Sequence, residues 1–121
     1  MRDGVKDMLA YLRERDVPFS IGSSTPRESA HSILSRSGLN KLFEPERIVL
    51  REDVTSTKPA PDVYKKTAAL MGVPPEEQLV FEDSVPGLKA ARDAGSLSIG
   101  MPSPFFTLQP QYPEPLQEAC A

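Results

Sequence analysis

Several features that often reveal a protein's class are scarce or absent from this sequence. Its 121 residues include one cysteine, one histidine and no tryptophan. The lone Cys120 cannot form an internal disulfide, and no Cys/His zinc pattern is present. No apolar run approaches the ~18 residues of a membrane span, and the N-terminus lacks the apolar core of a signal peptide. These absences predict a cytoplasmic protein with no membrane partner.

An excess of positive charge is lacking as well. Fourteen basic residues face 17 acidic ones, and the net charge of −3 gives no general reason to bind nucleic acid. The sequence also lacks a glycine-rich phosphate loop and a Ser-His-Asp set. We therefore expect no nucleic-acid partner, and the function must be sought in smaller clusters of polar residues.

Apolar strand segments alternate with helical patterns along most of the chain. Such alternation predicts βαβ units and an α/β fold with a mainly parallel sheet. Thr25-Pro26-Arg27-Glu28 has the pattern of a helix start with Thr25 as the N-cap, and Ser84 or Asp83 is expected to cap the last helix. The predicted strands are 17–22, 47–50, 78–81 and 96–99, and the predicted helices are 5–12, 26–37, 61–71 and 84–94.

The pattern changes near residue 102. Five of the 13 prolines fall between Pro102 and Pro115, and the helical and strand periodicities disappear there. Residues 1–101 are therefore predicted to form the core domain, and residues 102–121 a Pro-rich, irregular tail.

Three polar clusters follow predicted strands, and these loops share one edge of a parallel sheet. Ser23, Ser24 and Thr25 follow the first strand, where hydroxyls and backbone N–H groups at a helix N-terminus suit an anion. Ordinary capping is the alternative, and we favour it for Thr25. Lys58 lies in a proline-stiffened loop, Lys58-Pro59-Ala60-Pro61. A stiffly held ammonium could neutralise phosphoryl charge. Taken alone, however, this loop favours the alternative, a surface lysine before a Pro-initiated helix.

The third cluster is Glu82-Asp83, two adjacent carboxylates at the end of an apolar run. Both stay ionised only near positive charge, which Mg²⁺ would supply. Helix capping is again the alternative. Taken alone, this pair does not decide between a metal site and a cap.

In this order and spacing, the clusters resemble those of the haloacid dehalogenase-like hydrolases, in the branch of phosphatases and β-phosphoglucomutases. The resemblance covers about residues 4–100, including Lys58-Pro59-Ala60-Pro61-Asp62 and Phe81-Glu82-Asp83-Ser84. It implies a Rossmann-like, three-layer core. It also implies that Ser23, Ser24 and Lys58 bind the phosphoryl group, with Ser23 and Lys58 catalytic. Glu82 and Asp83 would hold Mg²⁺, with Asp83 the more direct ligand.

The sequence departs from the family in one large respect. The family's first motif, Asp-x-Asp-x-Thr on an apolar strand, is absent, and so is the helical cap domain. The resemblance therefore implies a core without its first, central strand, which would lie between the strands ending at Gly22 and Phe81. The sheet must then have a gap or re-pair. Exposed strand edges also predict low stability or self-association.

Three functions follow as hypotheses. The first is a Mg²⁺-dependent phosphatase of a small phosphorylated metabolite, acting through an aspartyl-phosphate, of which this chain is an inactive part. The second is a truncated, non-catalytic interaction or regulatory protein. The third is a sugar-phosphate mutase of the same family; a dehalogenase is disfavoured, since the Glu82-Asp83 pair suits a metal.

Overall fold

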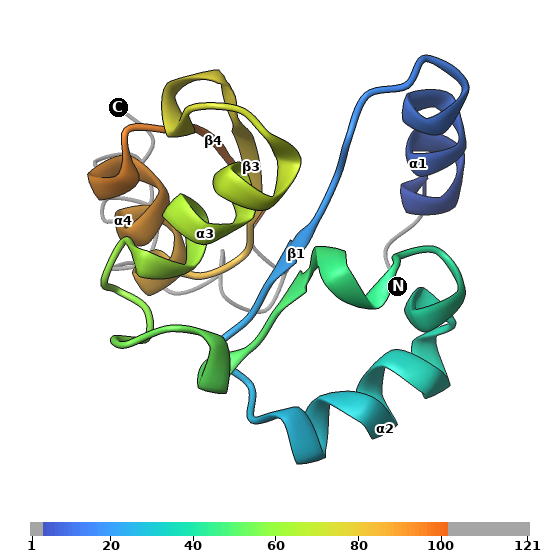
Figure 1. Cartoon of the computed structure of the whole chain (residues 1–121), viewed down its shortest axis with the longest axis horizontal. Coiled ribbons are helices and arrows are strands. Elements are labelled where there is room, and N and C mark those ends of the chain that lie inside the picture. The colour runs from blue at the N-terminus through green and yellow to red at the C-terminus, as the bar shows by residue number, and fades with distance from the viewer. Residues whose placement is uncertain (1–3, 102–121) are drawn as a thin grey trace.

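The computed structural model describes residues 4–101. Within them, helices and strands alternate as the sequence predicts (Figure 1). The helices are α1 (Val5–Glu14), α2 (Arg27–Ser37), α3 (Asp62–Met71) and α4 (Val85–Ala94). The strands are β1 (Ile21–Gly22), β2 (Ile48–Val49), β3 (Leu79–Glu82) and β4 (Leu97–Gly100). Four 3₁₀ turns complete the elements: η1 (Leu39–Lys41), η2 (Pro45–Arg47), η3 (Arg51–Asp53) and η4 (Pro75–Glu77).

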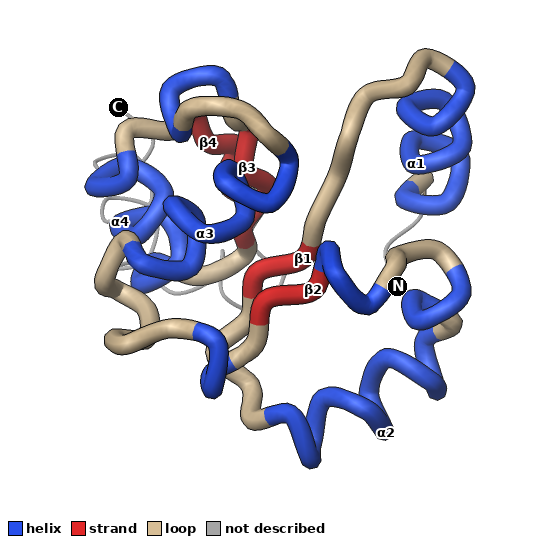
Figure 2. Tube along the Cα trace, in the orientation of Figure 1, coloured by secondary structure: helices blue, strands red, loops and turns tan. Residues whose placement is uncertain are grey.

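The strands form two separate parallel pairs (Figure 2). Ile21 of β1 lies opposite Ile48 of β2, and Phe81 of β3 lies opposite Ile99 of β4. Among residues 4–101, no strand joins β1 to β3. Of the two outcomes expected for a sheet without its central strand, the structure has the gap and not the re-pairing.

The two strand pairs share one helical layer. α3 contacts β1 and β2 and packs against α4, which in turn contacts β3 and β4. α1 and α2 lie on the other side of β1 in Figure 1. A single apolar cluster joins β2, α3, β3 and α4: Val49, Val63, Tyr64, Val80, Ala90, Ala91 and Ala94. The result is an α/β, Rossmann-like core, and the shared core holds the two pairs together in the absence of strand pairing.

One face of the β3–β4 pair remains open. Val80 is buried beneath the helices, whereas Leu79, Phe81, Leu97 and Ile99 on the opposite face are 44–69% exposed. These four side chains are paired by the strand register, so they form one continuous apolar surface. Parallel sheets are ordinarily covered on both faces.

The N-terminus of α2 departs from the prediction. Pro26, not Thr25, occupies the cap position and makes no side-chain cap bond. The backbone N–H of Arg27 donates instead to both carboxylate oxygens of Glu52, at 2.9 and 3.1 Å. The acceptor thus comes from η3, 25 residues away in the chain, while Thr25 Oγ1 accepts the Ser23 hydroxyl. The Thr25 cap predicted from local sequence therefore does not form.

The start of α4 and the C-terminal ends of α2, α3 and α4 agree with the sequence. Ser84 caps α4, with its Oγ accepting the N–H of Gly87 at 3.1 Å. Gly38, Gly72 and Gly95 follow α2, α3 and α4 with φ of 78°, 74° and 91°. A positive φ is what favours glycine after a helix.

No helix in the described range is long and apolar enough to cross a membrane. The predicted Pro-rich tail, residues 102–121, lies outside the described residues.

Candidate functional site

The three predicted clusters meet at Lys58. Its Nζ donates to the Gly22 carbonyl at the end of β1, at 3.1 Å, and to Glu82 Oε2 at the end of β3, at 2.9 Å. Its backbone N–H donates to Ser24 Oγ at 3.3 Å. The peptide bond between Lys58 and Pro59 is cis. Lys58 therefore connects the carboxyl ends of both strand pairs, the edge where ligands bind in open α/β sheets.

Glu82 is buried and fully engaged. Its Oε2 accepts from Lys58 and from the hydroxyl of Tyr64, which lies in α3. Its Oε1 accepts from the Asp83 N–H at 3.1 Å and from Ser84 Oγ at 3.2 Å. Burial would raise the pKa of Glu82, but the Lys58 charge and these hydrogen bonds outweigh it and hold the pKa below its usual value. Glu82 is thus a carboxylate paired with Lys58.

Tyr64 completes the arrangement around this pair. Burial and the neighbouring Glu82 carboxylate raise the pKa of the Tyr64 hydroxyl far above its usual value, which keeps it a donor. The Lys58 ammonium also lies 5.1 Å from the centre of the Tyr64 ring, within reach of a cation–π interaction. Sequence reasoning missed Tyr64, because nothing in its spacing from Glu82 marks a contact.

Gly87 is a second residue that sequence reasoning left without a role. A Cβ at this position would overlap the Glu82 carboxyl group. A glycine inside a helical pattern lacks the Cβ that would keep another group away. The glycine is visible in the sequence, but nothing in the sequence names Glu82 as the group that approaches it.

Ser23 and Ser24 lie in the loop after β1. The Ser23 N–H donates to the Val49 carbonyl at 2.9 Å and extends the β1–β2 pairing. Its hydroxyl donates to Thr25 Oγ1 at 2.9 Å and accepts the Thr25 N–H at 3.1 Å. Both serines are half-buried. Ser24 contacts the Lys58 loop directly, and Ser23 adjoins Gly22, whose carbonyl binds Lys58.

The two acids predicted to hold Mg²⁺ have different surroundings. Asp83 is exposed, whereas Glu82 is buried and its four hydrogen bonds engage both oxygens. Within residues 4–101, no group of three or more His, Cys, Asp or Glu side chains is placed to hold a metal. Carboxylate oxygens are suitable ligands for Mg²⁺, but Glu82 and Asp83 alone do not make a complete site. Metal binding at the pair stays a prediction.

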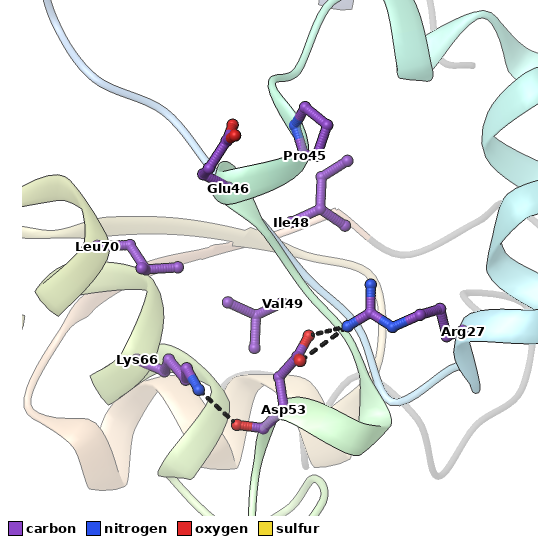
Figure 3. A pocket seen from close by; sticks show the side chains of 8 residues that line it. All are labelled: Arg27, Pro45, Glu46, Ile48, Val49, Asp53, Lys66 and Leu70. Atoms are coloured by element: carbon purple, nitrogen blue, oxygen red, sulfur yellow. Dashed lines mark hydrogen bonds and ion pairs between the residues drawn. The ribbon is translucent and has the colours of Figure 1, made fainter.

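A separate cavity of about 200 Å³ lies beside β2 and does not include these residues (Figure 3). Its basic side chains are already occupied. Arg27 donates to both oxygens of Asp53 at 2.7 Å, and Lys66 Nζ donates to the Asp53 carbonyl at 2.8 Å. The candidate site is therefore the Lys58 cluster and not this cavity.

Comparison with known proteins identifies the family of this chain. The model of the haloacid dehalogenase-like hydrolases matches residues 1–101. Validoxylamine A 7'-phosphate phosphatase of Streptomyces hygroscopicus subsp. limoneus is 32% identical over 99 residues, which cover 82% of this chain and 46% of that protein. This chain spans about half the length of such curated relatives.

Solved structures agree with the sequence comparison. A phosphoglucomutase-like protein of Thermotoga maritima superposes with a TM-score of 0.83 at 30% identity, over 99% of this chain and 53% of that one. A family hydrolase of Deinococcus radiodurans R1, solved with bound phosphate and sodium, superposes with a TM-score of 0.79 at 33% identity. The match covers 99% of this chain and 52% of that one. The chain belongs to the haloacid dehalogenase-like hydrolase family.

Proposed function

We propose that this chain forms the phosphoryl-binding part of a phosphatase site for a small phosphorylated metabolite. One observation carries the proposal: the Lys58 ammonium is held at the shared strand edge, between the Gly22 carbonyl and the Glu82 carboxylate. A positive charge fixed in advance can neutralise a phosphoryl group at little further ordering cost. The phosphate bound in the Deinococcus radiodurans relative supports the same ligand class.

Each side chain has a stated part in this proposal. Lys58 would stabilise the charge of the phosphoryl oxygens. The Ser23 hydroxyl would donate a hydrogen bond to one of these phosphoryl oxygens. That bond would replace the one it now donates to Thr25 Oγ1 at 2.9 Å. Ser24 holds the Lys58 loop through the 3.3 Å bond from the Lys58 N–H, and by family resemblance its backbone would lie near the phosphoryl group.

The nucleophile is the part that this sequence does not supply. By family resemblance the reaction uses an aspartate that becomes an aspartyl-phosphate, but the 121 residues contain no Asp-x-Asp pair. Asp83 would hold Mg²⁺, which neutralises phosphoryl charge, together with ligands that residues 4–101 do not provide. We therefore expect the 121-residue chain to bind phosphate but not to turn over a phosphate ester.

Binding of orthophosphate, measured by calorimetry with and without Mg²⁺, tests the first half of this proposal. Lys58→Met should abolish saturable binding. Lys65→Met is the matched control, since it removes the same charge from an exposed position in α3. Binding that survives Lys58→Met, or that Lys65→Met weakens equally, would refute the assignment.

Hydrolysis of p-nitrophenyl phosphate tests the second half. The unaltered chain should not exceed the rate without protein. Turnover that depends on Lys58 would show that this chain contains a nucleophile after all, and the inactivity would then be rejected.

A sugar-phosphate mutase is the second candidate, favoured by the likeness to the phosphoglucomutase-like structure. It would use the same phosphoryl-binding residues. The two functions differ in the acceptor of the phosphoryl group, which is water in a phosphatase and a sugar hydroxyl in a mutase. Following the label from a ³²P-sugar phosphate, in a protein that also contains the nucleophile, separates them.

A further inference from the structure

The Glu82 carboxylate is fixed on every side by named groups. The backbone N–H of Asp83 and the hydroxyl of Ser84 hold Oε1, at 3.1 and 3.2 Å. The Tyr64 hydroxyl and the Lys58 ammonium share Oε2. Gly87 leaves the space that the carboxyl group fills. Glu82 therefore has one well-defined position, and Lys58 is oriented against it.

Tyr64 differs from the other groups in reaching both members of the ion pair. Its hydroxyl binds Glu82, and its ring lies beside the Lys58 ammonium at 5.1 Å from the ring centre. The Tyr64 side chain is itself buried, with 6% of its surface exposed. It also lies in the core cluster that α3 shares with both strand pairs. A rigid ring in the core thus carries the polar end that faces the site.

Lysine needs such a partner more than most residues do. Its ammonium is a point charge on a flexible four-carbon chain, so its direction must be set by the groups around it. The Gly22 carbonyl and Glu82 Oε2 supply two acceptors. Without the Tyr64 hydroxyl, Lys58 would be the only partner of Oε2 among residues 4–101. The carboxylate would then draw the ammonium toward itself and away from an incoming anion.

We propose that Tyr64 is a positioning residue of the phosphoryl site, which acts through Glu82 to set where the Lys58 ammonium points. The effect of Tyr64 on phosphate binding rests on the proposed function, whereas its effect on the position of the Lys58 ammonium does not. This positioning role predicts that the hydroxyl matters separately from the ring: phenylalanine at position 64 fills the core and still leaves Lys58 less well directed.

Tyr64→Phe and Thr67→Val form a matched pair of variants. Thr67 is also a buried α3 residue. Its hydroxyl bonds Gln78 Oε1 at 2.6 Å and the Tyr64 backbone carbonyl at 3.1 Å, and neither acceptor is a side-chain atom of Tyr64, Lys58 or Glu82. Each variant removes one buried hydroxyl with little change of shape. Only Tyr64→Phe should alter the position of the Lys58 ammonium. A purely structural role for Tyr64 would make the two variants behave alike.

The first readout is the ¹⁵N resonance of the Lys58 ammonium, assigned by its disappearance in Lys58→Met. We expect Tyr64→Phe to shift or broaden it and Thr67→Val to leave it in place. The second readout is the Kd for orthophosphate, which should weaken about tenfold in Tyr64→Phe, the range for losing a hydrogen bond to a charged group, and less than twofold in Thr67→Val.

The outcomes separate the two proposals. An unchanged Lys58 resonance in Tyr64→Phe overturns the positioning role. A changed resonance in a chain that never binds phosphate supports the positioning role and rejects the proposed function. Should Tyr64→Phe fail to fold, the unaltered chain still decides: a slowly exchanging Tyr64 hydroxyl proton and an NOE between the Tyr64 ring and the Lys58 ε-methylene are required, and their absence overturns the role.

Discussion

Replacing Gly87 by alanine should destabilise this protein, although the same change in most helices does the opposite. Gly87 lies in the first turn of α4, and glycine within a helix is ordinarily about 1 kcal/mol worse than alanine. Here the added Cβ would overlap the buried Glu82 carboxyl group. The local preference for alanine is therefore opposed by the loss of the site's best-connected carboxylate.

The size of the destabilisation follows from the interactions that Glu82 would lose. A displaced carboxylate leaves the Lys58 ammonium and the Tyr64 hydroxyl without their shared acceptor. Breaking a buried ion pair costs about 3–5 kcal/mol, and the helical gain of about 1 kcal/mol offsets part of it. We expect Gly87→Ala to lower the free energy of unfolding by about 2–4 kcal/mol.

Urea unfolding followed by far-ultraviolet circular dichroism measures this change. The decisive control is the same substitution in a Glu82→Ala background, where the obstructing carboxyl group is gone. There Gly87→Ala should be neutral or stabilise by up to about 1 kcal/mol, a coupling that a double-mutant cycle reports directly. A Gly87→Ala chain as stable as the unaltered one, with Glu82 present, would refute the reasoning.

Three further changes have defined outcomes. Because the folded protein holds the pKa of Glu82 below its ordinary value of 4.5, its contribution to stability is complete above that pH and is lost as the pH falls through the lower folded value. Urea midpoints at pH 7, 5 and 3 should therefore drop at pH 3, and a rise there would contradict the assignment. Gly22→Ala would bring a Cβ within 2.8 Å of Val63 Cγ2. It should cost about 1–3 kcal/mol by overpacking, checked by urea unfolding. Glu52→Ala removes the acceptor of the Arg27 N–H and should cost about 1 kcal/mol by the same measurement, whereas an unchanged midpoint would show that α2 needs no cap.

The helices were more predictable than the strands because their signals are local. The glycines after α2, α3 and α4 lie next to the helices they end, and each takes a positive φ. The first strand was predicted over residues 17–22, yet β1 is only Ile21–Gly22. A strand forms only where a neighbouring strand pairs with it, and β2 pairs only with Ile21 and Gly22. Val17 lies before this paired region and is 44% exposed. Apolar composition alone could not reveal that the partner was missing.

The convergence of the three clusters was predictable from topology. Loops after parallel strands share one edge, and the bonds from Lys58 to Gly22 and Glu82 join them there. The contact between Glu82 and Tyr64, 18 positions away, was not predictable, because nothing in the spacing of the two residues marks it. Likewise, Glu52 and not Thr25 supplies the acceptor at the start of α2. Contacts between side chains far apart in the sequence do not show in its hydrophobic periodicity.

The separation of the two strand pairs has a thermodynamic consequence. A strand that joins the edge of an ordinary sheet gains one row of backbone hydrogen bonds, whereas one entering between β1 and β3 gains a row on each side. Because β1 spans only Ile21–Gly22 whereas β3 spans Leu79–Glu82, such a segment would gain bonds on both sides only beside the two residues of β1. Its affinity should therefore rise with length up to this overlap and then more slowly, along β3 alone.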